Sequence, residues 1–273
     1  MTQPYWQTRK NTFKERIRTE PGVAMWLTVP WPPLAEIVGA AGADATFIDL
    51  EHTTMTLETA EALIIASEAA GVTPIARPAG IDAHTSSKLL DAGAMGLIFA
   101  NIRTGAQAAE AIAGTLYPPA GTRGWGGSHT RYAMWEGGAA ATQLRESDPA
   151  KRGVYSPQYV EKATNDILRV FIVESVEGVE NIDDILAVEH LDAVLFGWAD
   201  YAADVGFDVE ACQAAADLVY RKCRERGVGI SVSIGQAGET GWYPGSFYIA
   251  GIDCLLMSSA LTNSVQQAKQ AIG

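Results

Sequence analysis

Ionisable residues follow short apolar runs at four places in this sequence. Asp49-Leu50-Glu51-His52 follows one run, Arg77 and Glu174 end two others, and Gly197-Trp198-Ala199-Asp200 follows a fourth. Two carboxylates on neighbouring strand ends repel each other unless a cation or a shared proton lies between them. A hard divalent ion, with water and substrate oxygens completing its shell, would join Glu174 to Asp200. The alternative is a helix N-cap for Asp200 and a surface position for Glu174.

Arg77 and His52 each allow a functional and a structural interpretation. Arg77 ends an apolar run before Pro78, and its guanidinium suits bidentate binding of a carboxylate or an enolate oxygen. An ion pair with Asp49 or Glu51 is the alternative. His52 is one of four histidines and lies beside both carboxylates, so it could be a general base or a structural loop residue.

The elements that must position these residues alternate along the chain. Eight short apolar runs are typical of strands buried on both faces of a parallel sheet. Eight alternations with helices favour a (β/α)8 TIM barrel, which carries its functional residues at the carboxyl ends of the strands. The predicted strands are Ala24–Thr28, Thr46–Leu50, Pro74–Arg77, Gly96–Asn101, Val170–Glu174, Ala193–Gly197, Gly229–Ser233 and Asp253–Ser258.

Ala-rich amphipathic segments between the runs predict the helices. Four of them are followed by Gly42, Gly71, Gly93 or Gly227, as expected of left-handed caps. Residues 1–273 form one predicted domain, with an N-terminal extension or helix over 1–21. The long irregular segment 114–165 predicts an active-site cover or a subunit contact. The predicted helices are Leu34–Ala41, Leu57–Ala70, Ser86–Ala92, Ala106–Ala113, Val179–Ala187 and Glu210–Arg226.

Composition excludes several classes of protein. A formal net charge of -12 without a basic block disfavours nucleic-acid binding. No apolar signal region or run of about 18 apolar residues is present, so no membrane partner is expected. Three cysteines without a CxxC motif predict a reducing, cytoplasmic setting. No lysine lies on a predicted strand, so aldolase chemistry, if present, would need a metal rather than a Schiff base.

Several motifs stand in order over nearly the whole chain. They are FIDLEHTTM (47–55), IARPAG (75–80), LLDAGAMGLIFANIRTGAQA (89–108), YPPAGTRGWGGS (117–128), IVESVEGVENIDDILAVEHLDAVLFGWADYAADVG (172–206) and GIDCLLMSSAL (251–261). Together these motifs resemble the HpcH/HpaI family of metal-dependent pyruvate aldolases, which includes hydroxy-oxoheptanedioate aldolase, keto-deoxyglucarate aldolase and macrophomate synthase. The resemblance implies a barrel of the phosphoenolpyruvate/pyruvate type that cleaves or forms a 4-hydroxy-2-oxo acid through a pyruvate enolate.

The resemblance also implies a role for each matching residue. Glu174 and Asp200 match the carboxylates that hold Mg, Mn or Co, and Arg77 matches the arginine on the pyruvate oxo group. His52 matches the catalytic base, and Asp91 matches the carboxylate that a neighbouring subunit supplies to it. Asp49 and Glu51 match family acids around the site, and the backbone amides of Gly197, Trp198 and Ala199 match the binding site of the substrate carboxylate. The resemblance implies a hexamer as well, built from dimers that exchange their C-terminal helix.

The chain departs from the family pattern beside these positions. Ile172 stands where glutamine is usual, and Trp198 and Tyr201 replace a proline and a leucine. Bulky residues near the metal are expected to reshape the pocket for the second substrate, an aldehyde. Decarboxylation of an oxaloacetate-like acid is the alternative reaction, because it forms the same enolate. A non-catalytic degenerate barrel is a further alternative, disfavoured because every ionisable family position is present.

Overall fold

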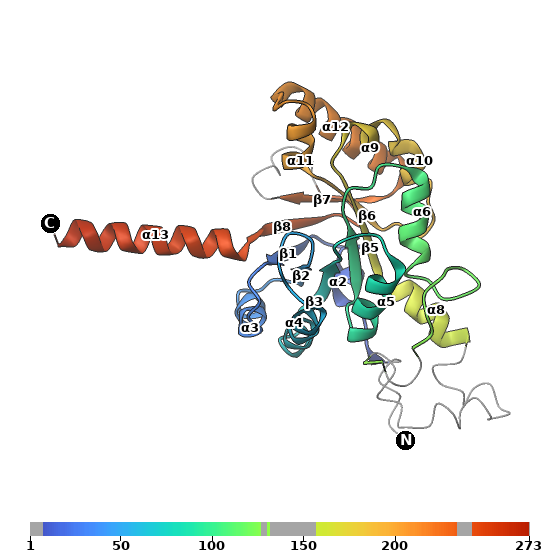
Figure 1. Cartoon of the computed structure of the whole chain (residues 1–273), viewed down its shortest axis with the longest axis horizontal. Coiled ribbons are helices and arrows are strands. Elements are labelled where there is room, and N and C mark those ends of the chain that lie inside the picture. The colour runs from blue at the N-terminus through green and yellow to red at the C-terminus, as the bar shows by residue number, and fades with distance from the viewer. Residues whose placement is uncertain (1–7, 127–129, 132–156, 234–241, 273) are drawn as a thin grey trace, which may run out of the picture.

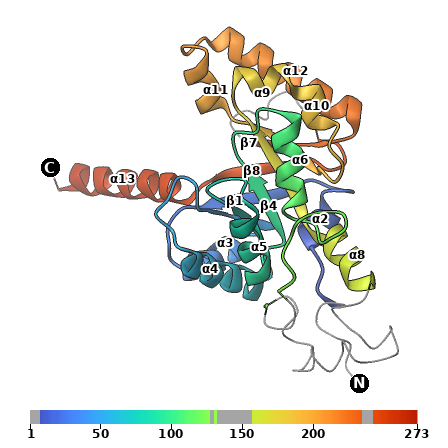
Figure 2. The same ribbon diagram turned by 45° about the vertical axis from the view of Figure 1, so that its right-hand side comes forward.

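The computed structural model describes residues 8–126, 130–131, 157–233 and 242–272. Its eight strands pair in sequence order, all in parallel, and β8 pairs with β1 to close a barrel (Figures 1 and 2). The closed barrel predicted from the alternation is therefore confirmed. The strands are β1 (Gly22–Leu27), β2 (Ala45–Asp49), β3 (Thr73–Arg77), β4 (Gly96–Phe99), β5 (Leu168–Val173), β6 (Ala193–Phe196), β7 (Gly229–Ser233) and β8 (Phe247–Ile252).

The helices between β1 and β7 cover the outside of the barrel, whereas α2 precedes β1 and α13 follows β8. The longer predicted helices are confirmed, and Gly42, Gly71, Gly93 and Gly227 all have the positive φ expected of them. The predicted helix 179–187 is instead two short helices that meet at Asn181. The helices are α2 (Thr12–Arg16), α3 (Pro33–Ala40), α4 (Leu57–Ala69), α5 (Ala83–Ala92), α6 (Gly105–Ala113), α8 (Pro157–Asp166), α9 (Val176–Glu180), α10 (Ile182–Leu186), α11 (Trp198–Asp204), α12 (Val209–Arg226) and α13 (Asp253–Ala271).

The last strand lies earlier than predicted. The run 253–258 begins α13, and β8 is the preceding segment Phe247–Ile252. Asp253 is buried and accepts hydrogen bonds from the backbone N–H groups of Thr28 and Val29 at 2.9–3.0 Å. This carboxylate ties the start of α13 to the end of β1. The apolar run was misread because its leucines are exposed on α13 and do not enter the barrel.

Alternation along each strand decides which side chains enter the barrel. Phe47 and Phe247 face the interior near its amino end and meet edge to face, with ring centroids 5.7 Å apart. Phe13 from α2 packs on both, at 6.4 and 5.2 Å, and fills this end of the barrel. The opposite, carboxyl end is the end open to a ligand.

Much of the segment 114–165 lies outside the described residues, namely 127–129 and 132–156. Its predicted role as a cover or contact falls mainly on those residues. Its described end is α8, whose Tyr159 is buried against Tyr117 and Trp125. Among the described helices, none is both long enough and apolar enough to cross a membrane.

Candidate functional site

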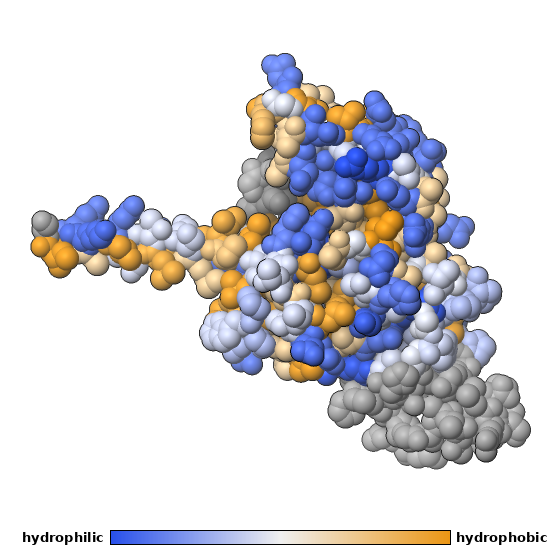
Figure 3. Space-filling view, in the orientation of Figure 1, coloured by the Kyte–Doolittle hydropathy of each residue, from blue (hydrophilic) through white to orange (hydrophobic). Residues whose placement is uncertain are grey.

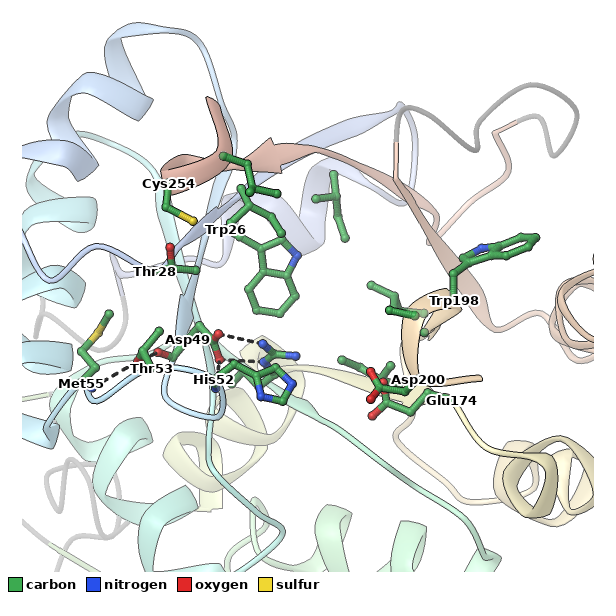
Figure 4. A pocket seen from close by; sticks show the side chains of 18 of the residues that line it. Trp26, Thr28, Asp49, His52, Thr53, Met55, Glu174, Trp198, Asp200 and Cys254 are labelled. Carbon is green, nitrogen blue, oxygen red and sulfur yellow. Dashed lines mark hydrogen bonds and ion pairs between the residues drawn. The ribbon is translucent and has the colours of Figure 1, made fainter. Parts of the chain in front are cut away.

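Three ionisable side chains enter the barrel because they continue its inward-facing series. Asp49 follows Phe47 by two residues, Arg77 follows Ile75, and Glu174 follows Ile172, and these three apolar residues belong to the interior core. The register places Asp49 directly beside Arg77. All three residues surround a cavity of about 740 Å³ at the carboxyl ends of the strands, a volume typical of a small-molecule site (Figure 4).

Arg77 is held in a fixed orientation by its neighbours. Its Nε and Nη2 donate to the two carboxylate oxygens of Asp49, each at 2.8 Å, and its Nη1 lies 3.0 Å from Glu51 Oε2. The guanidinium carbon lies 4.4 Å from the centre of the Trp26 ring, which is a cation–π contact. The ion pair and the pocket position that seemed to be alternatives are therefore both present.

The pKa of Asp49 responds to two opposing effects. Burial of the carboxyl would raise its pKa, but the hydrogen bonds and positive charge of Arg77 outweigh burial and hold the pKa below its usual value. Asp49 Oδ1 also accepts from the backbone N–H groups of Glu51 and His52, at 2.9 and 3.4 Å. One ionised side chain thus fixes both Arg77 and the loop that carries His52.

Glu174 and Asp200 form a carboxylate pair at the facing edge of the cavity (Figure 4). Burial and the nearby charge of Asp200 raise the pKa of Glu174 to about 7. The backbone N–H of Asn101 donates to Glu174 Oε1 at 2.8 Å. A Cβ atom at Gly197 would overlap the Glu174 side chain, so the close approach of β6 to this carboxylate requires glycine.

Among the described residues, no lysine, arginine or histidine forms an ion pair with Glu174 or Asp200, and the charge of Asp200 is one cause of the raised pKa of Glu174. Within the described residues, no group of three or more His, Cys, Asp or Glu side chains is arranged to hold a metal ion. Two carboxylates nevertheless match the way Mg²⁺ is usually bound, by one or two carboxylates together with water and substrate oxygens. The donor set therefore fits a hard divalent cation.

Backbone amides at the start of α11 face the same region. Gly197 precedes this helix, and its N–H donates to the Val173 carbonyl at 3.0 Å, so this amide belongs to the barrel. The amides of Trp198 and Ala199 lie in the first turn, where helices have no internal hydrogen-bond partners. Helix geometry therefore leaves the amides of Trp198 and Ala199, but not the amide of Gly197, as candidate donors to an anion.

The two bulky replacements near Asp200 lie differently from what the sequence suggested. Tyr201 is buried against Phe196, with ring centroids 5.0 Å apart, and does not line the cavity. The ring of Trp198 packs edge to face on Phe196 and points away from Glu174 and Asp200. The expectation that both rings reshape the substrate pocket is corrected: Tyr201 stabilises α11, and Trp198 borders the cavity with its ring turned aside.

His52 and Asp91 occupy separate places within one chain. His52 lines the cavity with its side chain 65% exposed, and its Nε2 lies 3.9 Å from Glu51 Oε2. Asp91 is on α5, outside the cavity lining, where Arg123 Nη2 donates to it at 2.8 Å. Arg123 is itself buried and stacked on Tyr117. A buried arginine therefore orients the Asp91 carboxylate.

Two residues of the site were not singled out from the sequence. Trp26 covers one face of Arg77, but a tryptophan in an apolar strand is indistinguishable from an ordinary core residue. Asn101 donates to Glu174 and has a left-handed φ of 55°, which is uncommon outside glycine. A signal for Asn101 existed, because it follows β4 as the other functional residues follow their strands.

Known proteins resemble this chain over most of its length. The family profile described as HpcH/HpaI aldolase/citrate lyase matches residues 23–235. A 4-hydroxy-2-oxo-heptane-1,7-dioate aldolase of Shigella sonnei is 29% identical, over 92% of each chain. A hydroxypyruvate/pyruvate aldolase of Deinococcus radiodurans is 34% identical, over 72% of this chain and 65% of that relative. The crystal structure of an HpcH/HpaI aldolase/citrate lyase family protein from Burkholderia cenocepacia J2315 superposes with a TM-score of 0.80 at 25% identity, covering 95% of this chain and 99% of the other.

Proposed function

Because this chain belongs to the HpcH/HpaI aldolase/citrate lyase family, we propose that its carboxylate pair and Arg77 serve a divalent-metal-dependent carbon–carbon lyase. The enzyme is an aldolase that cleaves or forms a 4-hydroxy-2-oxo acid, and pyruvate is its 2-oxo acid partner. The single observation that carries this proposal is the pair Glu174 and Asp200, which has no ion-pair partner among the described residues and lines the same cavity as the clamped Arg77.

Glu174 and Asp200 would hold Mg²⁺, Mn²⁺ or Co²⁺ in this proposal. When bound, the metal supplies a Lewis acid that withdraws charge from substrate oxygens. The raised pKa of Glu174 supports the assignment, because a cation would relieve the repulsion that causes it. The first-turn amides of Trp198 and Ala199, beside the Gly197 turn, would donate to the substrate carboxylate.

Arg77 would stabilise the oxygen that becomes negative in the enolate. A guanidinium carries five N–H donors, and Asp49 accepts two of them in this structure, one from Nε and one from Nη2. The remaining N–H on Nη2 and the two on Nη1, whose charge is paired with Glu51, can therefore turn to the substrate. Because Asp49, Glu51 and Trp26 fix the guanidinium in advance, little reorganisation is needed when charge develops on that oxygen.

His52 would act as the base that removes a proton from the distal hydroxyl during cleavage. Its exposed ring lies at the mouth of the cavity and needs a partner that orients it. We propose Asp91 of a neighbouring subunit for this part. The Arg123 contact already fixes the direction of Asp91 in its own chain.

The C-terminal helix supports an oligomer. α13 extends away from the barrel, and its apolar residues lie along one side of the helix (Figures 1 and 3). Leu261 and Val265 are 66% and 51% exposed on it. A second apolar cavity of about 440 Å³ lies between α3 and the start of α13, lined by Leu34, Ile37 and neighbours. We propose that α13 is exchanged between subunits of a dimer and that dimers assemble into a hexamer.

The three cysteines are free, which supports a cytoplasmic setting.

Manganese binding tests the metal assignment directly. Titration of the metal-free protein with Mn²⁺, followed by electron paramagnetic resonance, should give one site per chain. Glu174→Gln and Asp200→Asn should each weaken binding at least about tenfold, because each removes a charged ligand. Glu177→Gln, which changes an exposed carboxylate three residues further along the chain, is the matched control and should bind normally. Unchanged binding in both site variants would refute the assignment.

A further inference from the structure

The cavity has two chemically different sides. Figure 4 places Glu174 and Asp200 on one side and Thr28, Met55 and Cys254 on the opposite side, with Asp49, the partner of Arg77, between them. Pro30, which follows β1, and Leu255, which lies in the first turn of α13, line the same cavity. We call Thr28, Pro30, Met55, Cys254 and Leu255 the outer wall. It presents hydroxyl, thioether, thiol and hydrocarbon groups, and none of its members is an acid, lysine or arginine.

The described charged groups around the cavity have a net negative charge even when the pair Glu174 and Asp200 is left out of the sum. Among the described residues that line it, Arg77 is the one lysine or arginine. Its guanidinium is shared between Asp49 at 2.8 Å and Glu51 at 3.0 Å, so two carboxylates surround one cation. With His52 counted as neutral, this cluster keeps one negative charge even when a divalent metal balances Glu174 and Asp200. A second substrate that carried a carboxylate would be repelled here.

We propose, on the basis of the aldolase function above, that the second substrate is an uncharged aldehyde whose hydrocarbon or hydroxylated chain rests on the outer wall. In the condensation direction a methyl proton of pyruvate passes to a base, and C3 attacks the aldehyde carbon. The carbon–oxygen π pair moves to oxygen, which takes a proton. Pyruvate and aldehyde together thus equal the 4-hydroxy-2-oxo acid, which carries a single carboxylate.

Three aldehydes of similar length test this proposal on the wild-type protein with Mn²⁺ and pyruvate. They are butanal, methyl 4-oxobutanoate and the acid 4-oxobutanoate. We expect kcat/KM for the acid to be at least about tenfold below that for the two neutral aldehydes, since one uncompensated like charge costs at least that factor. A kcat/KM for the acid equal to or above those of the neutral aldehydes would overturn the proposal.

A single substitution on the outer wall provides a second test. Cys254 is exposed, so Cys254→Lys places a cation there without disturbing the core. Cys254→Met is the neutral control of comparable length. The ratio of kcat/KM for the acid to that for butanal should rise at least about fivefold in the lysine variant over the methionine variant. An unchanged ratio would show that the aldehyde chain does not rest on this wall.

The aldehyde-free reaction separates this proposal from the proposed function. Exchange of pyruvate methyl protons with heavy water needs the enolate but no aldehyde. Exchange together with a preference for the acid would overturn the substrate class alone. Absence of exchange with every divalent metal would overturn the aldolase function and this proposal with it.

Discussion

Asp49→Asn removes one negative charge from the buried clamp on Arg77 while keeping the shape of the side chain. In the wild type the Asp49 side chain is 2% exposed and accepts two charge-assisted hydrogen bonds of 2.8 Å from Arg77. An asparagine can accept one of them, but its amide group would face the other guanidinium nitrogen. Two donors would then oppose each other inside the barrel mouth.

The expected cost follows from these contacts. A hydrogen bond to a charged group contributes about 1.5–3 kcal/mol, so losing one and weakening the other should lower the free energy of unfolding by about 2–3 kcal/mol. The rate of enolate formation should fall about 100-fold, because Arg77 and the His52 loop both lose their anchor. Glu51→Gln is the matched control, because it removes one ion pair of a carboxylate that is 22% exposed. This variant should lower the free energy of unfolding by less than about 1 kcal/mol.

Urea unfolding followed by circular dichroism gives the first quantity, and exchange of pyruvate methyl protons gives the second. Wild-type stability and exchange in Asp49→Asn would refute the clamp. Equal destabilisation by Glu51→Gln would show that the bidentate contact is not the important one.

The pH dependence of stability gives a further check. Because the pKa of Asp49 is lowered in the folded protein, the stabilisation that Asp49 contributes is complete above the usual pKa of 3.8. This contribution is lost as the pH falls through the folded pKa.

Three further perturbations test other parts of the site and the assembly. In the metal-free protein the pKa of Glu174 is about 7 in the folded state, whereas its usual value is 4.5, so the free energy of unfolding should decline as pH rises between these values. Urea titrations at several pH values should show that Glu174→Gln removes this decline. An identical pH profile in the variant would contradict the buried charge. His52→Ala should reduce aldol cleavage at least about tenfold more than oxaloacetate decarboxylation, since only cleavage requires hydroxyl deprotonation, and equal losses would disprove that role. The double variant Leu261→Asp, Val265→Asp should lower the mass of the oligomer measured by light scattering. Asn263→Asp, on the other face of α13, is the control and should leave that mass unchanged. An unchanged mass in the double variant would exclude α13 from the interface.

The sequence predicted the parts of this fold that depend on alternation. Apolar runs buried on both faces identified seven of the eight strands, and the same two-residue period explains why Asp49, Arg77 and Glu174 point inward. β8 was not predicted because Ala250 and Gly251 interrupt its larger apolar residues, whereas the unbroken apolar run after Asp253 lies on an exposed helix. Apolar residues that are exposed in one chain carry the same sequence signal as core residues.

The site was predicted in its residue types but not in all of its contacts. Spacing could not show that Arg77 would be both ion-paired and in the cavity, since that depends on the register of β2 against β3. Nor could it show that the Trp198 ring turns aside onto Phe196, or that the Gly197 amide is occupied by Val173. These features arise from packing between elements that lie apart along the chain.

The central claim is that the chain forms a pyruvate enolate with the help of a metal held by Glu174 and Asp200. It is tested most directly by proton NMR of pyruvate in heavy water, with the protein and Mg²⁺ or Mn²⁺. The account predicts loss of the methyl signal at a rate proportional to protein concentration, abolished by EDTA and by Glu174→Gln. Absence of exchange with any divalent metal, or exchange that continues in EDTA, would contradict it.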